Sequence, residues 1–275
     1  MKVFVSVDLE GVSGIVDWAQ CTRGGEDYEL GRRLALAEVN AAIEGAQAAG
    51  GTEILVNDAH SVMRNLAPDL LAGHASYLSG RFKPGYMMQG LDGSFNAVLF
   101  VGYHAAMPTA GILSHTYNPG AILDVRVNGT MAGESGINAL VAQHHRVPVA
   151  VVTGDQYVGP EAEPFCPGIR AVVVKRSVSR TAAENLHPER ARSMITEQVA
   201  AALRELPRLT PPAIGLPVTI EVDLATPDMA EQACWISSVQ RTAGNTVRFT
   251  EEDPLRAFRT FMTVVFLTRS LVETR

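Results

Sequence analysis

The chain has 275 residues, of which 47% are hydrophobic and 19% are charged, a balance that is typical of a folded globular protein and excludes a disordered one. Its net charge of -6 lacks the cationic surplus that phosphate binding requires, so no nucleic-acid partner is expected. Without a signal peptide's apolar core or a run of about 20 apolar residues, the chain is expected to be cytoplasmic and not to bind a membrane.

Strands and helices are expected to alternate through the first part of the chain. Residues 2–8 are rich in β-branched side chains and predict a strand, and Asp27 is placed to cap the helix that follows. Residues 53–56 predict a second strand, so the unit is strand, helix, strand and implies parallel pairing through a right-handed crossover. The unbroken apolar run at 97–101 indicates a central strand covered on both faces.

A hairpin and a second series of buried elements come next. Asn128-Gly129 supplies the positive φ angles of a type I′ turn, which predicts a hairpin beginning with strand 124–127. Further along the chain we expect a helix opening at 133–136, strands at 149–152 and 171–174, and a long helix over 189–205.

A group of four prolines between residues 207 and 217 marks the clearest shift in composition, and we place a domain boundary there. We therefore expect an α/β fold whose mostly parallel, helix-flanked sheet occupies a metal-binding catalytic domain at 1–206. A smaller α+β portion is expected at 207–275, where subunits could make contact in an oligomer. It should contain strands at 218–222 and 246–249 and a helix beginning at Asp253.

Acidic and imidazole side chains follow the expected strands of the first domain. In open α/β sheets, ligands bind outside the carboxyl ends of the strands, so these residues are expected to meet. They are Asp8, Glu10, His60, His104 and, at a helix start, Glu134. Three converging carboxylates would repel one another, whereas two divalent ions neutralise them, and Asp8 is placed to bridge such a pair. Spacing alone leaves open that each residue is an ordinary turn or cap residue.

Histidine 115 lies beyond the same strand as His104, where it could reach the crevice without being a ligand. Its ordinary pKa of about 6.5 suits a proton carrier near neutral pH. The four other histidines are expected at the surface, and they are His74, His144, His145 and His187. The glycines around Ser13 and Ser135 match neither a phosphate loop nor a serine nucleophile elbow.

Five blocks together resemble a known family. They are 6–14 (SVDLEGVSG), 56–61 (VNDAHS), 102–105 (GYHA), 114–115 (SH) and 133–139 (GESGINA). In this order they are similar to the zinc-dependent D-aminopeptidases of bacterial dipeptide-transport operons. The C-terminal third matches less distinctly.

The resemblance implies two Zn²⁺ ions per subunit, bridged by Asp8, with Glu10 and His60 on one ion and His104 and Glu134 on the other. It also implies His115 as the catalytic residue. The implied substrates are short peptides with an N-terminal D-amino acid, such as D-Ala-D-Ala, and the implied assembly is a ring-like homo-oligomer, a decamer.

Two alternatives stay open at this point. A two-metal phosphoesterase would use the same ion pair, although the five blocks contain no Lys or Arg to hold a phosphate. A non-catalytic small-molecule binder could occupy the same sheet edge. The ligand types also suit manganese or cobalt.

Overall fold

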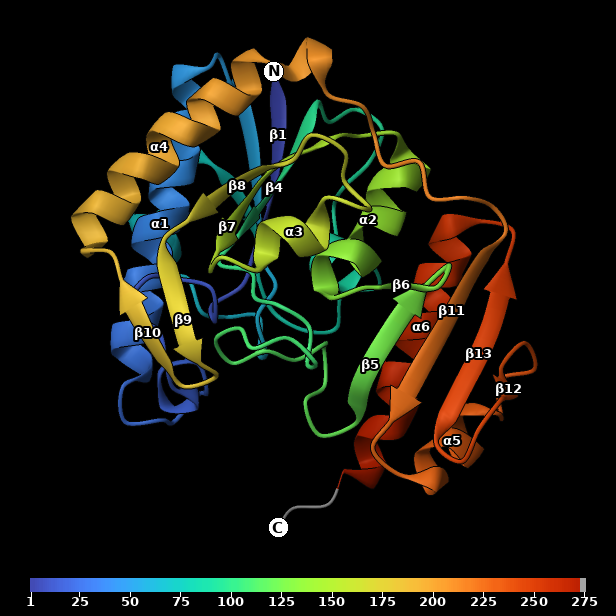
Figure 1. Ribbon diagram of the computed structural model, residues 1–275. Helices are drawn as coiled ribbons and strands as arrows, with labels where there is room; N and C mark the ends of the chain where they lie inside the picture. The colour runs from blue at the N-terminus through green and yellow to red at the C-terminus, as the bar shows by residue number, and fades with distance from the viewer. Residues whose placement is uncertain (273–275) are drawn as a thin grey trace.

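Six parallel strands form the main sheet in the computed structural model, which describes residues 1–272 (Figure 1). The strand order is β3-β2-β1-β4-β7-β8, so β1 and β4 occupy the centre. The strands are β1 (Lys2–Val7), β2 (Glu53–Asp58), β3 (Ser76–Leu78), β4 (Ala97–Val101), β7 (Val149–Gly154) and β8 (Arg170–Val173). The expected α/β class and its parallel sheet are confirmed.

Helices cover both faces of this sheet, which explains why its central strands β1, β4 and β7 are buried along almost their whole length. On one face lie α1 (Tyr28–Ala48) and α4 (Pro188–Arg204), packed against alternate side chains of β1 such as Val5. Phe4 points to the opposite face, where α2 (Glu134–His145) packs, with α3 (Val158–Ala162) against its end. Helix α1 begins after Asp27 as predicted, but the Asp27 side chain makes no capping hydrogen bond.

A second, antiparallel sheet of five strands stands beside the first in the order β12-β13-β11-β5-β6 (Figure 1). Its strands are β5 (Ile122–Val127), β6 (Thr130–Met131), β11 (Val218–Leu224), β12 (Gln240–Arg241) and β13 (Thr246–Glu251). Asn128 and Gly129 have φ angles of 49° and 81°, as the predicted hairpin turn requires. Helices α5 (Pro227–Ala233) and α6 (Pro254–Thr268) pack against this sheet, and α6 also contacts α2.

Strands from both sides of residue 206 build the second sheet, because β5 and β6 pair with β11 from the C-terminal portion. The expected division into domains 1–206 and 207–275 therefore stays a prediction. The chain thus forms two lobes, one around each sheet, and the β5–β6 hairpin from before residue 206 is part of the antiparallel sheet of the second lobe.

The remaining elements are short. A two-stranded hairpin, β9 (Lys175–Ser179) with β10 (Ala182–Asn185), extends from the main sheet and was not predicted. The 3-10 turns are η1 (Trp18–Gln20), η2 (Pro68–Leu70), η3 (Ala72–His74), η4 (Tyr86–Met88), η5 (Leu206–Arg208) and η6 (Arg269–Leu271). The three cysteines are free thiols, and within residues 1–272 we find no helix suited to crossing a membrane.

Candidate metal centre

Three neighbouring strands deliver the central residues of the site. Asp8 follows β1, His60 follows β2 and His104 follows β4, and these strands lie in the order β2-β1-β4. Their register aligns Val7 with both Asp58 and Val101, so the three strands end at the same level of the sheet. The predicted convergence at the carboxyl edge follows directly from this register.

One group of side chains gathers around the Asp8 oxygen Oδ1. The His60 nitrogen Nδ1 lies 2.9 Å from Asp8 Oδ1 and 3.1 Å from Glu10 Oε2. On the other side of the ring, His60 Nε2 donates to the Cys21 carbonyl at 2.9 Å, which fixes the ring and turns Nδ1 towards the carboxylates. Although burial lowers the pKa of His60, Glu10 and Asp8 raise it well above its usual value.

A second group faces the other oxygen of Asp8. His104 Nε2 lies 3.5 Å from Asp8 Oδ2 and 3.5 Å from Glu134 Oε1. The opposite ring nitrogen of His104 donates to the Ala105 carbonyl at 3.0 Å. Glu134 is the first residue of α2, and its Oε1 accepts the backbone N–H of Tyr117 at 2.7 Å. Asp8 thus presents one oxygen to each group.

The residues of both groups are of the types that bind divalent cations. Both carboxylate oxygens of Glu10 and the Nε2 atom of His104 are buried and have no hydrogen-bond partner within the described chain. Burial, with a smaller contribution from the negative charge of Asp8, raises the pKa of Glu134 to about 7, so added positive charge beside this carboxyl group would favour its ionised form. Mixed imidazole and carboxylate donors are the set that Zn²⁺ accepts.

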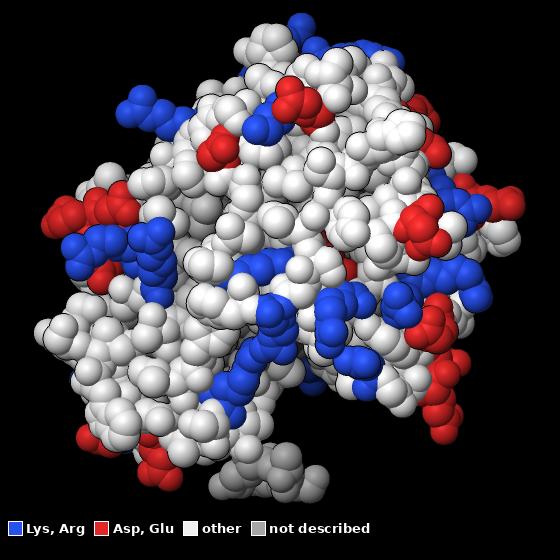
Figure 2. Space-filling view, turned by 180° about the vertical axis from the view of Figure 1, so that it is seen from behind, with Lys and Arg blue, Asp and Glu red and all other residues white. Residues whose placement is uncertain are grey.

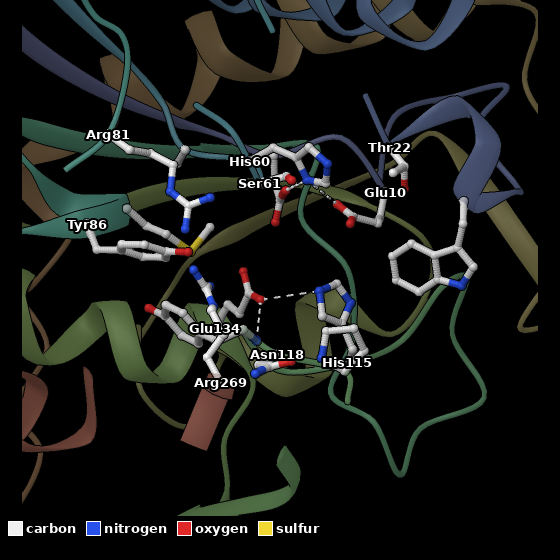
Figure 3. A pocket seen from close by; sticks show the side chains of 16 residues that line it. Glu10, Thr22, His60, Ser61, Arg81, Tyr86, His115, Asn118, Glu134 and Arg269 are labelled. Atoms are coloured by element: carbon white, nitrogen blue, oxygen red, sulfur yellow. Dashed lines mark hydrogen bonds and ion pairs between the residues drawn. The ribbon is translucent and has the colours of Figure 1, made fainter. Parts of the chain in front are cut away.

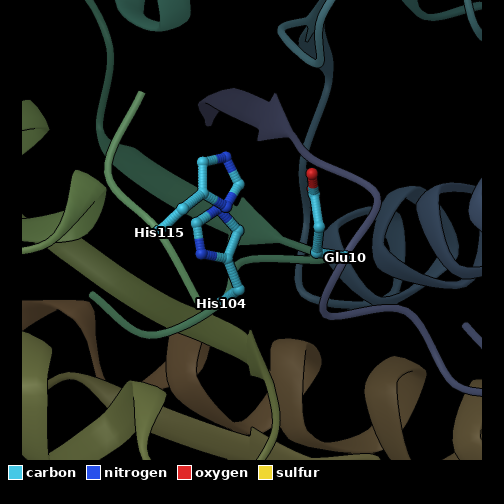
Figure 4. A group of neighbouring side chains, drawn as sticks. All are labelled: Glu10, His104 and His115. Carbon is cyan, nitrogen blue, oxygen red and sulfur yellow. The ribbon is translucent and has the colours of Figure 1, made fainter. Parts of the chain in front are cut away.

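His115 lies next to His104, with Glu10 nearby (Figure 4). Its ring stacks on His104 with centroids 4.1 Å apart, and Glu10, His104 and His115 form a further set of possible ligands within 4.8 Å. The Nδ1 atom donates to the Leu113 carbonyl at 2.9 Å, so Nε2 carries the lone pair, 3.8 Å from Glu134 Oε1. Burial and the neighbouring His104 lower the pKa of His115 to about 4, which keeps the ring neutral near neutral pH.

A cavity of about 440 Å³ is lined by Asp8, Glu10, His60, His115 and Glu134 (Figure 3). Its wall also contains side chains that the sequence reasoning missed, namely Trp18, Arg81, Tyr86, Tyr117, Asn118 and Arg269. They lie in loops and in the short 3-10 turns η1, η4 and η6, several residues away from the strand ends that carry Asp8, His60 and His104. The absence of Lys and Arg from the five sequence blocks therefore does not extend to the pocket, which contains two arginines.

A buried lysine holds the loop that carries Glu10. Lys175 is 1% exposed, and its ammonium group donates to the backbone carbonyls of Glu10, Val12 and Ile15. In the same loop, a Cβ atom on Gly11 would lie 1.9 Å from the Tyr103 carbonyl oxygen, so only glycine permits this close approach. The loop is fixed from both sides.

The four remaining histidines lie away from the pocket. His74, His144 and His187 are exposed and His145 is half-buried, which agrees with the expected surface positions.

Comparisons with known proteins give one consistent match. The D-aminopeptidase family, peptidase family M55, matches residues 1–263. A D-aminopeptidase of Bacillus subtilis (strain 168) is 38% identical over 274 residues, which cover 97% of each chain. The solved structure of the Zn-dependent D-aminopeptidase DppA from Bacillus subtilis, a self-compartmentalizing protease, superposes with a TM-score of 0.93 at 35% identity, again covering 97% of each chain.

Proposed function

The chain belongs to the D-aminopeptidase family, peptidase family M55, and on this premise we propose that it is a dinuclear-zinc enzyme. It removes the N-terminal D-amino acid from short peptides, for example D-Ala-D-Ala. The observation that carries the proposal is the position of Asp8, whose two carboxylate oxygens face two separate pairs of nitrogen and carboxylate donors.

The proposed ligands divide into two sets. Asp8, Glu10 and His60 would hold one ion, and Asp8, His104 and Glu134 would hold the other. Two divalent ions offset the negative charge of the three carboxylates, which supports a count of two. When bound, the ion pair supplies an activated water nucleophile and Lewis-acid polarisation of the peptide carbonyl.

His115 is the proposed proton carrier of the reaction. Its neutral Nε2 accepts the proton that the attacking water loses, and then delivers this proton to the leaving amine as the C–N bond breaks. The Leu113 carbonyl and the edge of Trp18, 5.3 Å away between ring centroids, hold the imidazole in place for this transfer. The products are a free D-amino acid and the shortened peptide.

We also propose an assembly for the chain. Because the solved Bacillus subtilis relative is a self-compartmentalizing protease, this chain is proposed to form a ring-like homo-oligomer, with a decamer as the expected form, in the cytoplasm. A place in a dipeptide-transport operon is part of the same proposal. Sedimentation equilibrium of the purified protein tests the subunit number, and a monomeric mass would contradict it.

The decisive experiment joins metal analysis with a pair of stereoisomeric substrates. We expect two zinc ions per chain, hydrolysis of D-Ala-D-Ala, and no comparable hydrolysis of L-Ala-L-Ala. Chelation should abolish turnover and added zinc should restore it. Protein that hydrolyses D-Ala-D-Ala equally well after complete removal of metal would refute the proposal.

One structural observation favours a second candidate, a two-metal phosphoesterase. Arg81 and Arg269 line the pocket and are the kind of cationic groups that hold a transferring phosphoryl group. Release of phosphate from p-nitrophenyl phosphate at a rate comparable with peptide hydrolysis would support this candidate. Zinc-free protein that binds a ligand without turning it over would instead indicate a non-catalytic binder.

A further inference from the structure

Two arginines reach the pocket from different lobes. Arg81 lies between β3 and η4 of the first lobe, and Arg269 follows α6 of the second. Figure 3 shows both guanidinium groups on the Tyr86 side of the pocket, pointing inwards, with Thr22 on the opposite side and Glu10 and His60 between. The pocket therefore has a cationic end and an acidic middle.

Neither guanidinium group has an anionic partner among residues 1–272. No ion pair or side-chain hydrogen bond is formed by Arg81 or Arg269 within this part of the chain. Arg126 in the second sheet is the contrast, because it pairs with Asp124, Glu221 and Asp223. Two like charges that face one cavity repel each other, and an anion between them relieves that repulsion.

Aromatic side chains surround this end of the pocket, and one of them lies against Arg269. The Arg269 guanidinium lies 5.8 Å from the Phe266 ring centroid, and Phe266 in turn contacts Tyr86 at 5.6 Å. A second cavity of about 250 Å³ is lined by both arginines and by Phe82 and Phe266. The arginines thus stand where the two cavities meet, backed by aromatic rings.

Positive charge also gathers on the surface of the molecule, on the face opposite to that of Figure 1. In Figure 2, basic side chains gather round the hollow between the two lobes, while acidic side chains lie mostly at the periphery. An anionic ligand is therefore drawn towards the hollow even though the whole chain carries a net charge of -6.

We propose that Arg81 and Arg269 form a carboxylate anchor that binds the free C-terminal carboxylate of a short peptide substrate. This inference rests on the proposed aminopeptidase function. In an extended dipeptide the amine and the carboxylate lie about 7 Å apart, one on each side of the peptide bond. The acidic middle of the pocket suits the amine and the scissile bond, and the arginine end suits the carboxylate. Bidentate guanidinium contacts are well matched to a planar carboxylate.

The test uses two substrates that differ in one charge, D-Ala-D-Ala and D-Ala-D-alaninamide. In the zinc-loaded wild-type protein, we expect kcat/KM to be at least about 10-fold higher for the free acid, mainly through KM. R81Q and R269Q should each lower kcat/KM for the free acid by roughly 10- to 100-fold and leave the amide within about 3-fold. R269K keeps the positive charge but lacks the planar guanidinium group that binds a carboxylate through two hydrogen bonds. Its kcat/KM for the free acid should therefore lie between those of the wild type and R269Q.

Arg259 provides a matched control, since it is an exposed arginine of α6 outside the pocket, and R259Q should change neither substrate's kcat/KM. If the wild type does not distinguish acid from amide, or if R81Q and R269Q slow both substrates equally, the anchor is refuted while the aminopeptidase function stands. If the zinc-loaded protein hydrolyses neither substrate, the proposed function fails and the anchor fails with it.

Discussion

The two sheets of this molecule contribute to the pocket in different ways. The parallel sheet provides Asp8, His60 and His104 directly from the ends of three adjacent strands, whose hydrogen-bonded register sets their relative positions. The antiparallel sheet contributes no side chain of the ligand group from its strands. Its lobe adds Arg269, which follows α6, and its β5–β6 hairpin leads into the helix that begins with Glu134.

The carboxyl edge of the parallel sheet holds the proposed metal ligands, whereas turns and loops provide the other side chains of the pocket. Ligands of a metal pair need fixed geometry, which hydrogen-bonded strands supply, because a loose ligand set loses metal affinity. Contacts to a substrate can come from turns and from a second lobe. Substitutions at the parallel edge should therefore affect metal and catalysis, whereas substitutions in the antiparallel sheet should affect only stability.

The largest effect is expected at Asp8. D8N removes the charge that bridges the two groups, so zinc content should fall below one ion per chain and kcat/KM should fall by more than about 10³-fold. Elemental analysis and D-Ala-D-Ala hydrolysis measure both quantities. Asp223 of β11 is the matched aspartate in the other sheet, and D223N should keep both zinc ions. Equal zinc loss in the two variants would break the comparison.

Replacement of His115 should separate catalysis from metal binding. H115A removes the proton carrier, so kcat should fall by about 10²- to 10⁴-fold while the zinc content stays at two per chain. His115 also lies within ligand distance of Glu10 and His104, so the zinc measurement is informative. Loss of one zinc ion in H115A would show that this imidazole is a ligand, and unchanged kcat would remove it from the mechanism.

Lys175 tests whether the Glu10 loop depends on its buried cation. K175M keeps an unbranched side chain of similar size but leaves the carbonyls of Glu10, Val12 and Ile15 without their donor, so the free energy of unfolding should fall by about 3 kcal/mol. Urea unfolding measures this change. Zinc affinity should fall in the same variant, because the loop carries a proposed ligand. A stable variant with unaltered zinc affinity would contradict this role.

The smallest effect is expected at Arg126, on the antiparallel sheet. Its guanidinium lies 3.3 Å from Glu221 and 3.1 Å from Asp223, but the group is 29% exposed, and solvent screens such pairs. R126M should lower the free energy of unfolding by about 1 kcal/mol or less, with kcat/KM unchanged. A loss of activity in R126M would show that the antiparallel sheet also influences catalysis, against the expectation that it affects only stability.

The sequence was most informative where local pattern and topology act together. Runs of apolar residues predicted the central strands, and the rule that ligands collect at carboxyl ends predicted that Asp8, His60 and His104 would meet. Asn128-Gly129 predicted its hairpin turn, but nothing local indicated that this hairpin pairs with β11, since strand partners far along the chain are chosen by packing.

The missed residues share a physical reason. Arg81 lies in the loop before η4 and Arg269 begins the short turn η6, and their approach to one pocket depends on how α6 packs against α2 and on the course of that loop. Lys175 is charged and begins a strand, a position where an exposed side chain is the ordinary expectation, yet it is buried among three carbonyls. Tertiary contacts, which no short window of sequence contains, decide all three positions.

The pairing of β5 with β11 has a consequence for biosynthesis. The hairpin of β5 and β6 leaves the ribosome well before β11, so Val125 and Val127, both buried in the finished protein, wait without a partner strand while the intervening segment is made. An unpaired apolar edge of this kind invites association between nascent chains. Chaperone demand during translation should therefore be concentrated between the emergence of the hairpin and that of residues 218–224.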